Sequence, residues 1–339
     1  MNMRAIVVLF SVLVTTAAQA DVMVMKNGSR IVGTLIGGGE GTIKFETPWG
    51  GTLEVASENV VSVETEGTTT VMMADGEIYR DKKLLATQET LTIQREGQPP
   101  RSYPITDVKL VNPDPWMLGE GYNFTGRVNG GFQSERGNTD TDEVDVSYQV
   151  TLRSLEDRFA FRGVGEFNEA SGEKVAENWQ LRNKYDRFWG DDPDNYYGAK
   201  LRFEYDKFAD LDLRTLFGPH IGREFFDTSL LELRGEIGIV YVDEQFNVAE
   251  DNDYYGSLLE FEGESDILGF GTTLYFFHDT TINFDSWDEP LSNTTVGLRM
   301  PLILGFETAF EARYEYNGSA PDDVDTTDET YTFSIGYAW

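Results

Sequence analysis

The chain has 339 residues and a formal net charge of −32, from 27 Lys and Arg against 59 Asp and Glu. This acidity disfavours nucleic-acid binding, which needs a positive face to neutralise phosphates. The 13 % aromatic content argues against a wholly disordered chain, and the absence of cysteine excludes disulfides, thiol catalysis, zinc–thiolate sites and iron–sulfur clusters. The mean hydropathy of −0.37 is typical of a soluble β-rich protein. The order of apolar and polar residues along the chain gives a second indication of its fold class.

The N-terminus has the features of a secretory signal peptide. A basic start at 1–4 precedes an apolar stretch at 5–14, and Ala18–Gln19–Ala20 forms an A-x-A cleavage site before Asp21. A single membrane anchor is disfavoured because the apolar stretch is too short and ends in small residues. The sequence therefore predicts a signal peptide over 1–20, cleaved between Ala20 and Asp21, and a mature chain in an envelope or extracellular space.

Two copies of one β pattern follow, in residues 22–65 and 70–113. Each copy contains an Asn-Gly or Asp-Gly turn between short alternating segments, which is a strong hairpin signal. The matched segments are Val24–Gly28 with Met72–Gly76, Thr42–Phe45 with Thr92–Gln94, and Glu58–Val63 with Thr106–Val111. One copy alone buries little apolar surface, so we expect the two to pack together as one module over 21–113.

This module contains neither histidine nor clustered carboxylates, so its sequence indicates no catalysis. It is expected to bind a periplasmic protein or peptidoglycan, and a role as a spacer or folding cap fits the sequence equally well. A Pro-rich segment over 114–119 then breaks the pattern and predicts a linker.

From residue 120 onward, apolar and polar residues alternate with a period of two. Val144, Val146 and Tyr148 share one face of a segment, and Glu143 and Asp145 share the other. The segments are longer than the roughly 5–6 residues of strands in soluble sandwiches and match the roughly 9–11 residues of a tilted membrane strand. Charges in mid-segment keep mostly to one parity, as expected if the other face meets lipid.

The sequence thus predicts an all-β chain whose residues 120–339 form a transmembrane antiparallel up-and-down β-barrel of about 12 strands. Links from even to odd segments are mostly short, and links from odd to even segments are often longer, as in barrels with short periplasmic turns. The expected segments are 121–134, 140–153, 158–169, 176–189, 195–208, 211–226, 229–243, 253–264, 266–281, 292–302, 304–317 and 328–339.

Aromatic residues lie at the segment ends, as in the two interfacial girdles of a membrane barrel. The expected girdle residues are Phe188, Trp189, Tyr196, Tyr197, Phe225, Phe226 and Trp339 at one rim, and Trp179, Tyr241, Phe246, Tyr254, Tyr255 and Trp287 at the other. The last segment alternates strictly and includes Tyr337 and Trp339. This pattern is similar to the C-terminal signal that the assembly machinery of outer-membrane barrels recognises.

Two motifs carry a family resemblance. Gly131–Thr141 contains a Gly-Asn-Thr segment, and Tyr205–Phe208 is followed by Leu211–Arg214. Their order resembles the family named domain of unknown function 481, the salt-induced or YdiY-like outer-membrane proteins. The resemblance covers 120–339 and leaves out the repeat module. It implies an outer-membrane barrel without an established activity and supplies no catalytic residue.

The charged residues of the polar face are the candidate functional residues. Candidates for lining the lumen are Arg127, Arg153, Arg162, Arg182, Arg202, Glu204, Glu232, Arg234, Glu236, Glu311 and Arg313. Mixed signs on neighbouring strands favour an interior filled by ion pairs over a charge-selective pore, because a barrel of this size leaves little free width. We expect no catalytic, cofactor-binding or metal-binding residue.

The sequence leaves three functions open. The first is a structural or envelope-maintenance barrel in the outer membrane of a Gram-negative bacterium, with its N-terminal module in the periplasm. Its expected partners are the membrane lipid and the barrel-assembly machinery, and nucleic acid is not among them. The second is a narrow channel for ions or small solutes. The third is a lipid hydrolase that uses His278, for which a nucleophilic serine is the usual partner; His220 is expected to be structural.

Overall fold

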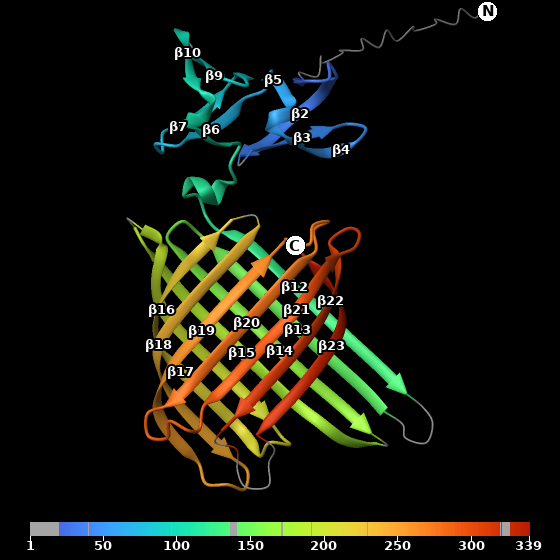
Figure 1. Cartoon of the computed structure of the whole chain (residues 1–339), viewed down its shortest axis with the longest axis vertical. Coiled ribbons are helices and arrows are strands. Elements are labelled where there is room, and N and C mark those ends of the chain that lie inside the picture. Colours follow the sequence, from blue (N-terminus) through green and yellow to red (C-terminus); the bar gives the residue numbers. More distant parts are fainter. Residues whose placement is uncertain are drawn as a thin grey trace, which may run out of the picture. The chain divides into compact units, whose positions relative to one another are not determined.

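The computed structural model describes residues 20–39, 41–95, 97–135, 141–170, 172–190, 192–228, 230–318, 320 and 326–339. These residues form strands and three short 3-10 helices, arranged in two compact units that divide between Leu118 and Gly119 (Figure 1). In this part of the chain, no helix is long and apolar enough to cross a membrane. Residues 1–19 of the predicted signal peptide lie outside the described residues.

The N-terminal unit is an 11-stranded sheet. Its strands are β1 (Asp21–Met25), β2 (Arg30–Gly39), β3 (Thr42–Thr47), β4 (Gly51–Ala56), β5 (Val60–Glu64), β6 (Thr69–Met73), β7 (Ile78–Lys82), β8 (Leu84–Thr87), β9 (Thr90–Arg95), β10 (Gln98–Pro104) and β11 (Val108–Val111). The 3-10 helices η1 (Ser57–Asn59) and η2 (Ile105–Asp107) precede β5 and β11, and η3 (Pro115–Leu118) lies within the predicted linker.

The two copies repeat with an offset of 48 residues, because the pair Met23–Val63 between β1 and β5 recurs as Val71–Val111 between β6 and β11. The same offset relates Ile43–Val55 to Leu91–Tyr103. Thr42–Phe45 therefore corresponds to Thr90–Ile93, and the predicted match to Thr92–Gln94 is wrong by two residues. The conserved feature is burial rather than identity, since Phe45 and Ile93 are both fully buried.

Each copy supplies a strand to the sheet of the other. Val63 of β5 pairs with Ala86 of β8, and Val111 of β11 pairs with Gly38 of β2. These two pairings are equivalent under the same offset of 48 residues, so the copies are related by an approximate twofold exchange. The apolar surface of each copy is covered only when the other is folded against it.

Asp21 ties the start of this unit to two distant segments. Its buried carboxylate accepts hydrogen bonds from the backbone N–H groups of Leu35 at 2.8 Å, Glu66 at 2.9 Å and Gly67 at 3.3 Å. Asp21→Ala leaves these donors without their acceptor, and we expect about 1–3 kcal/mol of lost local stability. Hydrogen–deuterium exchange of the full chain measures this as faster exchange at Leu35 and Glu66.

A matched control lies in the second copy. Among the residues that the structure describes, the Asp75 carboxylate accepts a hydrogen bond from the exposed N–H of Glu77, at 3.0 Å, and from no other donor. Asp75→Ala should therefore change exchange little. Equal exchange in the Asp21 and Asp75 variants would contradict the role assigned to Asp21.

The second unit is a closed antiparallel barrel of twelve strands, each paired with its neighbours in sequence. The strands are β12 (Asn123–Glu135), β13 (Thr141–Arg153), β14 (Asp157–Ala170), β15 (Glu173–Trp189), β16 (Asp192–Asp206), β17 (Leu211–Asp227), β18 (Leu231–Phe246), β19 (Asn252–Ser265), β20 (Thr273–Asn283), β21 (Leu291–Pro301), β22 (Phe306–Asn317) and β23 (Thr327–Ala338). The predicted all-β fold with a barrel of about 12 strands is confirmed, and Figure 1 shows the tilted strands.

One predicted segment begins too early. The segment 266–281 corresponds to β20, which starts at Thr273, and residues 266–272 form a connection with positive φ at Gly269, Phe270 and Gly271. Apolar residues misled the prediction, because Ile267, Leu268 and Phe270 read as a strand although all three are exposed in the connection. Every other predicted boundary lies within three residues of the observed one.

The up-and-down order gives the barrel two different ends. At one end of the barrel, β12 begins and β23 ends, and we call this the turn end. Its connections are 154–156, 190–191, 228–230, 266–272 and 302–305. The loop end has the connections 136–140, 171–172, 207–210, 247–251, 284–290 and 318–326. The Gly-Asn-Thr segment, residues 137–139, lies outside the described residues.

Candidate functional site: the charged interior of the barrel

The barrel inverts the usual distribution of residues in a soluble protein. Its outward side chains are apolar and exposed, and the exposed fractions of Ile221 and Ile239 are 57 % and 58 %. Its inward side chains include charged groups that are almost wholly buried, among them Asp186 at 0 % and Glu244 at 1 %. Strand alternation produces both faces at once, because successive side chains point to opposite sides of the sheet.

The structure places the predicted lumen residues in three settings. Arg127, Arg162, Arg182, Glu311 and Arg313 line a cavity on the β12–β13 and β22–β23 side. Arg202, Glu204 and Glu236 are buried in ion pairs, and Arg153 and Arg234 pair with Glu224 and Glu262. Glu232 is exposed near the turn end, opposite Asp227 and Glu264 in register.

One ion-pair cluster is centred on Asp186 of β15. Its carboxylate accepts a hydrogen bond from Arg158 Nε at 2.7 Å, and its other oxygen lies 2.8 Å from His220 Nε2. Arg158 also donates to Glu224 across the barrel, at 2.6 Å. The Tyr196 ring packs edge-on against the His220 imidazole. His220 therefore lies within a buried polar cluster, as the sequence indicated.

Glu236 of β18 continues this cluster. Lys184 and Lys200 each approach its carboxylate at 2.5 Å, and the Tyr196 hydroxyl donates to it at 2.7 Å. Lys200 also pairs with Glu260 at 2.6 Å. Each charge thus meets opposite charges at hydrogen-bond distance, which is the condition under which buried ions are tolerated.

A second cluster lies toward the loop end. Arg214 donates to Glu204 at 2.8 Å and to Glu244 at 2.6 Å, linking β16, β17 and β18. Arg202 donates to Asp279 at 2.6 Å. The Arg214 contacts join neighbouring strands, whereas the Arg202–Asp279 contact joins β16 to β20 through the barrel interior.

Several charged residues of the barrel interior were missed among the predicted candidates. They are Arg158, Arg214, Glu224, Glu244, Glu260, Glu262 and Asp279. Their parity along the strands was the available signal, since each shares a face with a predicted candidate or with a buried residue. The predicted girdle also needs correction: Phe188, Tyr196 and Tyr254 are at most 5 % exposed and lie inside, because their parity is that of the inward face.

Asp186, His220 and Glu236 bring three potential metal ligands within 4.8 Å of one another. The two carboxylates are already paired with Arg158, Lys184 and Lys200. A divalent cation placed here would be repelled by three fixed positive charges. The donor set therefore fits an ion-pair cluster better than a metal centre.

His278 lies on the outer face of β20, stacked against Phe276. Its ring nitrogens contact the hydroxyls of Thr294 at 2.8 Å and Thr280 at 3.0 Å. A hydrolytic triad needs a nucleophile and an orienting carboxylate on the imidazole, and both positions on this ring are taken by threonines. This geometry gives no support to the lipid hydrolase.

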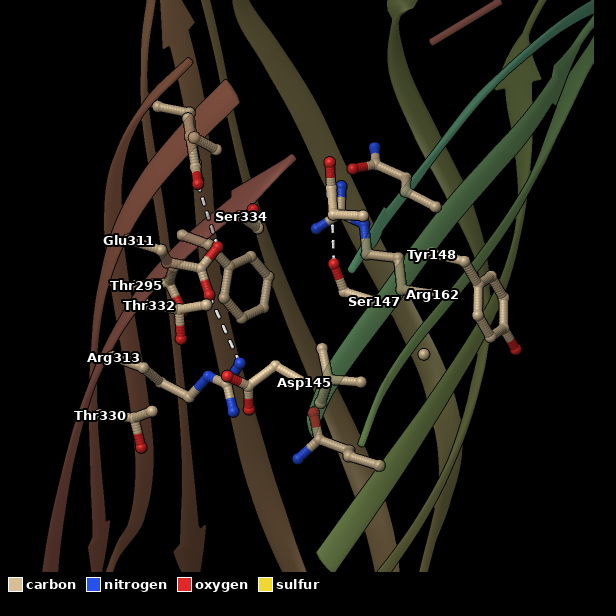
Figure 2. A pocket seen from close by; sticks show the side chains of 18 of the residues that line it. Asp145, Ser147, Tyr148, Arg162, Thr295, Glu311, Arg313, Thr330, Thr332 and Ser334 are labelled. Atoms are coloured by element: carbon tan, nitrogen blue, oxygen red, sulfur yellow. Dashed lines mark hydrogen bonds and ion pairs between the residues drawn. The ribbon is translucent and has the colours of Figure 1, made fainter. Parts of the chain in front are cut away.

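The cavity of about 170 Å³ lies between two walls of the barrel. Figure 2 shows Asp145 and Arg162 on one wall, with Glu311 and Arg313 on the other. Five arginines and six carboxylates line it, so its lining carries both signs. It borders the second cluster, since Arg182 of its lining lies 3.4 Å from Asp279.

The family model for "Protein of unknown function, DUF481" matches residues 128–339. The chain belongs to this family. The predicted family is therefore confirmed, and the repeat module lies outside the matched region. No curated protein matches the chain.

Among solved structures, the chain is similar to the NanC porin in a rhombohedral crystal form, at 9 % identity and a TM-score of 0.40, covering 63 % of this chain and 98 % of that one. It is also similar to the beta domain of the Bordetella autotransporter BrkA, at 10 % identity and a TM-score of 0.31, covering 65 % of this chain and 99 % of that one. A third similar structure is the outer membrane channel DcaP of Acinetobacter baumannii, at 9 % identity and a TM-score of 0.31, covering 95 % and 94 %. At these identities the likeness concerns the fold alone.

Proposed function

We propose that this DUF481 protein is an outer-membrane barrel with a closed lumen that holds the repeat module in the periplasm, where the module contacts another envelope component. The outward apolar face supports the membrane location. Exposed aliphatic and aromatic side chains cover the barrel wall, whereas charged residues are buried inside. In water such a surface would be far larger than the apolar patches of soluble monomers.

The observation that carries the closed lumen is the set of ion pairs that cross it. Arg158 reaches Glu224 at 2.6 Å, Lys200 reaches Glu260 at 2.6 Å, and Arg202 reaches Asp279 at 2.6 Å. A path for ions would have to displace these contacts, whose side chains are at most 13 % exposed. The interior therefore serves stability, and we place the contact with partners on the repeat module.

Planar-bilayer recording tests the closed lumen. The purified protein should give no stepwise current, because a passing ion would have to break these ion pairs. On gels, unheated and heated samples should migrate differently if a folded barrel is present. Stepwise current from a heat-shifting sample would favour the alternative, a narrow channel that uses the cavity beside Arg127 and Arg313.

Crosslinking tests the role of the module. Trp49 lies 76 % exposed between β3 and β4, so a photo-crosslinker at this position samples the surroundings without disturbing the core. Crosslinks in intact cells should capture an envelope protein or peptidoglycan, and digestion with a muramidase distinguishes the two. If the module forms neither adduct, the proposed contact is wrong and the repeat module acts as a spacer.

A further inference from the structure

The repeat module has two equivalent edge strands, one in each copy. Among the residues that the structure describes, β4 pairs only with β3, and β10 pairs only with β9. The offset of 48 residues relates these strands, because Ile43–Val55 corresponds to Leu91–Tyr103 (Figure 1). A free edge exposes backbone N–H and C=O groups that can pair with a further strand. The two edges can therefore be compared position by position.

In β4, three residues direct their backbone groups away from β3. The N–H of Ser57 donates to the carbonyl of Gly41 at 2.7 Å, so the neighbouring Ala56 belongs to a non-hydrogen-bonded pair of the ladder. Hydrogen-bonded and non-hydrogen-bonded pairs alternate, so Thr52, Glu54 and Ala56 all turn their N–H and C=O groups toward the open edge. All three residues are exposed. The edge of β4 thus offers a row of donors and acceptors to a further strand.

The equivalent edge of the second copy lacks two of these donors. Pro100 and Pro104 take the places of Thr52 and Ala56, and proline has no N–H. The register between β9 and β10 is also interrupted by a shift, whereas β3 and β4 pair without one. Prolines and bulges are devices that prevent pairing at a sheet edge. The second copy therefore blocks its edge, and the first copy leaves the same edge open to a strand.

The side chains of β4 indicate what kind of strand would fit. Leu53 and Val55 are half-buried, and Val55 packs against the core of the first copy. An added strand continues the sheet and covers these two residues with its own apolar side chains. Glu54 lies on the opposite face, 3.4 Å from Lys44, and both side chains are more than half exposed. Because the exposed Glu46 shares this face, negative charge is in excess there and favours a basic residue beside Glu54.

A second copy of this chain fits the edge poorly. Two β4 strands related by a twofold axis overlap most fully when Thr52 of one pairs with Ala56 of the other. This register places the two Glu54 side chains directly opposite each other, and like charges in that arrangement destabilise a sheet. The charge of the edge therefore favours a basic segment of a different protein over self-association.

We propose that β4 binds an extended segment of another envelope protein by strand addition. The segment pairs antiparallel with β4, as β3 does on the other side. Its apolar residues lie beside Leu53 and Val55, and a lysine or arginine lies beside Glu54. This inference rests on the proposed function, in which the module contacts another envelope component, and it names the class of that component and the strand that binds it.

A single substitution can block this edge without disturbing the fold. Ala56 has a φ of −59°, which proline adopts, and Pro104 at the equivalent position has a φ of −55°. Ala56→Pro removes one outward N–H, which the ladder with β3 does not use. Ala56→Ser keeps this N–H and is the matched control.

Fluorescence anisotropy of the purified full chain with a labelled peptide of alternating valine and lysine measures strand binding. Ala56→Ser should bind this peptide as the unaltered chain does, and Ala56→Pro should bind it about fivefold to tenfold more weakly, because one hydrogen bond is lost. A peptide of alternating valine and glutamate should bind at least about tenfold more weakly, since its carboxylates meet Glu54. Equal affinities of the two Ala56 variants would overturn the strand addition, and equal affinities of the two peptides would overturn the basic partner.

Methylation of the peptide backbone tests how the strand pairs. In the proposed arrangement the lysines share a face with Glu54, so their N–H groups point at β4 and the valine N–H groups point away. A peptide N-methylated at its lysines should lose binding, whereas one N-methylated at its valines should keep it. If the lysine-methylated peptide binds as well as the unmethylated one, the attraction is between side chains alone and the proposal is wrong.

The photo-crosslinker at Trp49 tests the partner in intact cells, because Trp49 lies in the turn that precedes β4. Protein adducts should disappear in Ala56→Pro and persist in Ala56→Ser. Adducts of peptidoglycan alone, or protein adducts that persist in Ala56→Pro, overturn this inference and leave the proposed function intact. The same holds for a dimer, seen by native mass spectrometry, that Ala56→Pro abolishes, since a second copy then occupies the edge. If the chain forms no adduct at all, the proposed contact of the module fails as well.

Discussion

Glu236→Leu should cost about 3–5 kcal/mol of unfolding free energy, because it leaves buried cations without their carboxylate. Lys184 and Lys200 both approach Glu236 at 2.5 Å. Neither lysine can reach bulk water, since their side chains are 11 % and 8 % exposed. Lys184 retains Asp186 at 3.5 Å and Lys200 retains Glu260 at 2.6 Å, so the barrel should be weakened rather than lost.

The measurement is urea unfolding of the barrel in detergent, followed by the heat-dependent gel shift. Glu156→Gln is the control, because Glu156 pairs with Arg187 at 2.7 Å but is 71 % exposed. Surface pairs of this kind contribute about 0–1 kcal/mol. If both variants unfold at the same urea concentration, the interior ion pairs do not stabilise the barrel. Stepwise current from the Glu236 variant alone would indicate that the pairs also close the lumen.

Much of the barrel could be predicted because membrane strands make a simple physical demand. One face must be apolar, so the period of two appears at every strand and fixes which residues point inward. The prediction from this alternation is wrong where apolar residues lie outside a strand. Ile267, Leu268 and Phe270 satisfy the pattern in sequence but lie in a connection, where positive φ at Gly269 and Gly271 turns the chain.

The repeat module shows a different limit. Its two copies were found from the Asn-Gly and Asp-Gly turns, which sequence records directly. The match at Thr42 was shifted by two residues because the identical dipeptides Thr42–Ile43 and Thr92–Ile93 were aligned, whereas the structure aligns buried Phe45 with buried Ile93. A shift of two keeps every side chain on its face, so alternation alone could not detect the error.

The ion pairs inside the barrel could not be predicted from the sequence. Arg158 and Glu224 are 66 positions apart, and Arg162 and Glu262 are 100 positions apart. Whether they meet depends on strand tilt and on the register with which the sheet closes, which parity does not determine. Sequence thus predicts which residues face inward, and only the closed barrel decides which charges become partners.

Ile239→Arg should prevent most of the chain from assembling, because it places a cation on the outer face near the middle of β18. Ile239 is 58 % exposed and is one of a row of apolar outward residues that includes Ile237 and Tyr241. Arginine facing lipid at mid-depth costs about 2–4 kcal/mol. The expected result is a several-fold lower folded fraction in lipid vesicles, measured by the heat-dependent gel shift.

Val248→Arg is the matched control for this prediction. Val248 follows β18 by two residues and is 90 % exposed, yet it lies in the connection 247–251 at the loop end, where water reaches it. The same chemical change there should leave assembly unaltered. A soluble barrel would tolerate both arginines equally, since each replaces an exposed apolar residue. The difference between two exposed positions therefore tests whether lipid, rather than water, surrounds the wall of this barrel.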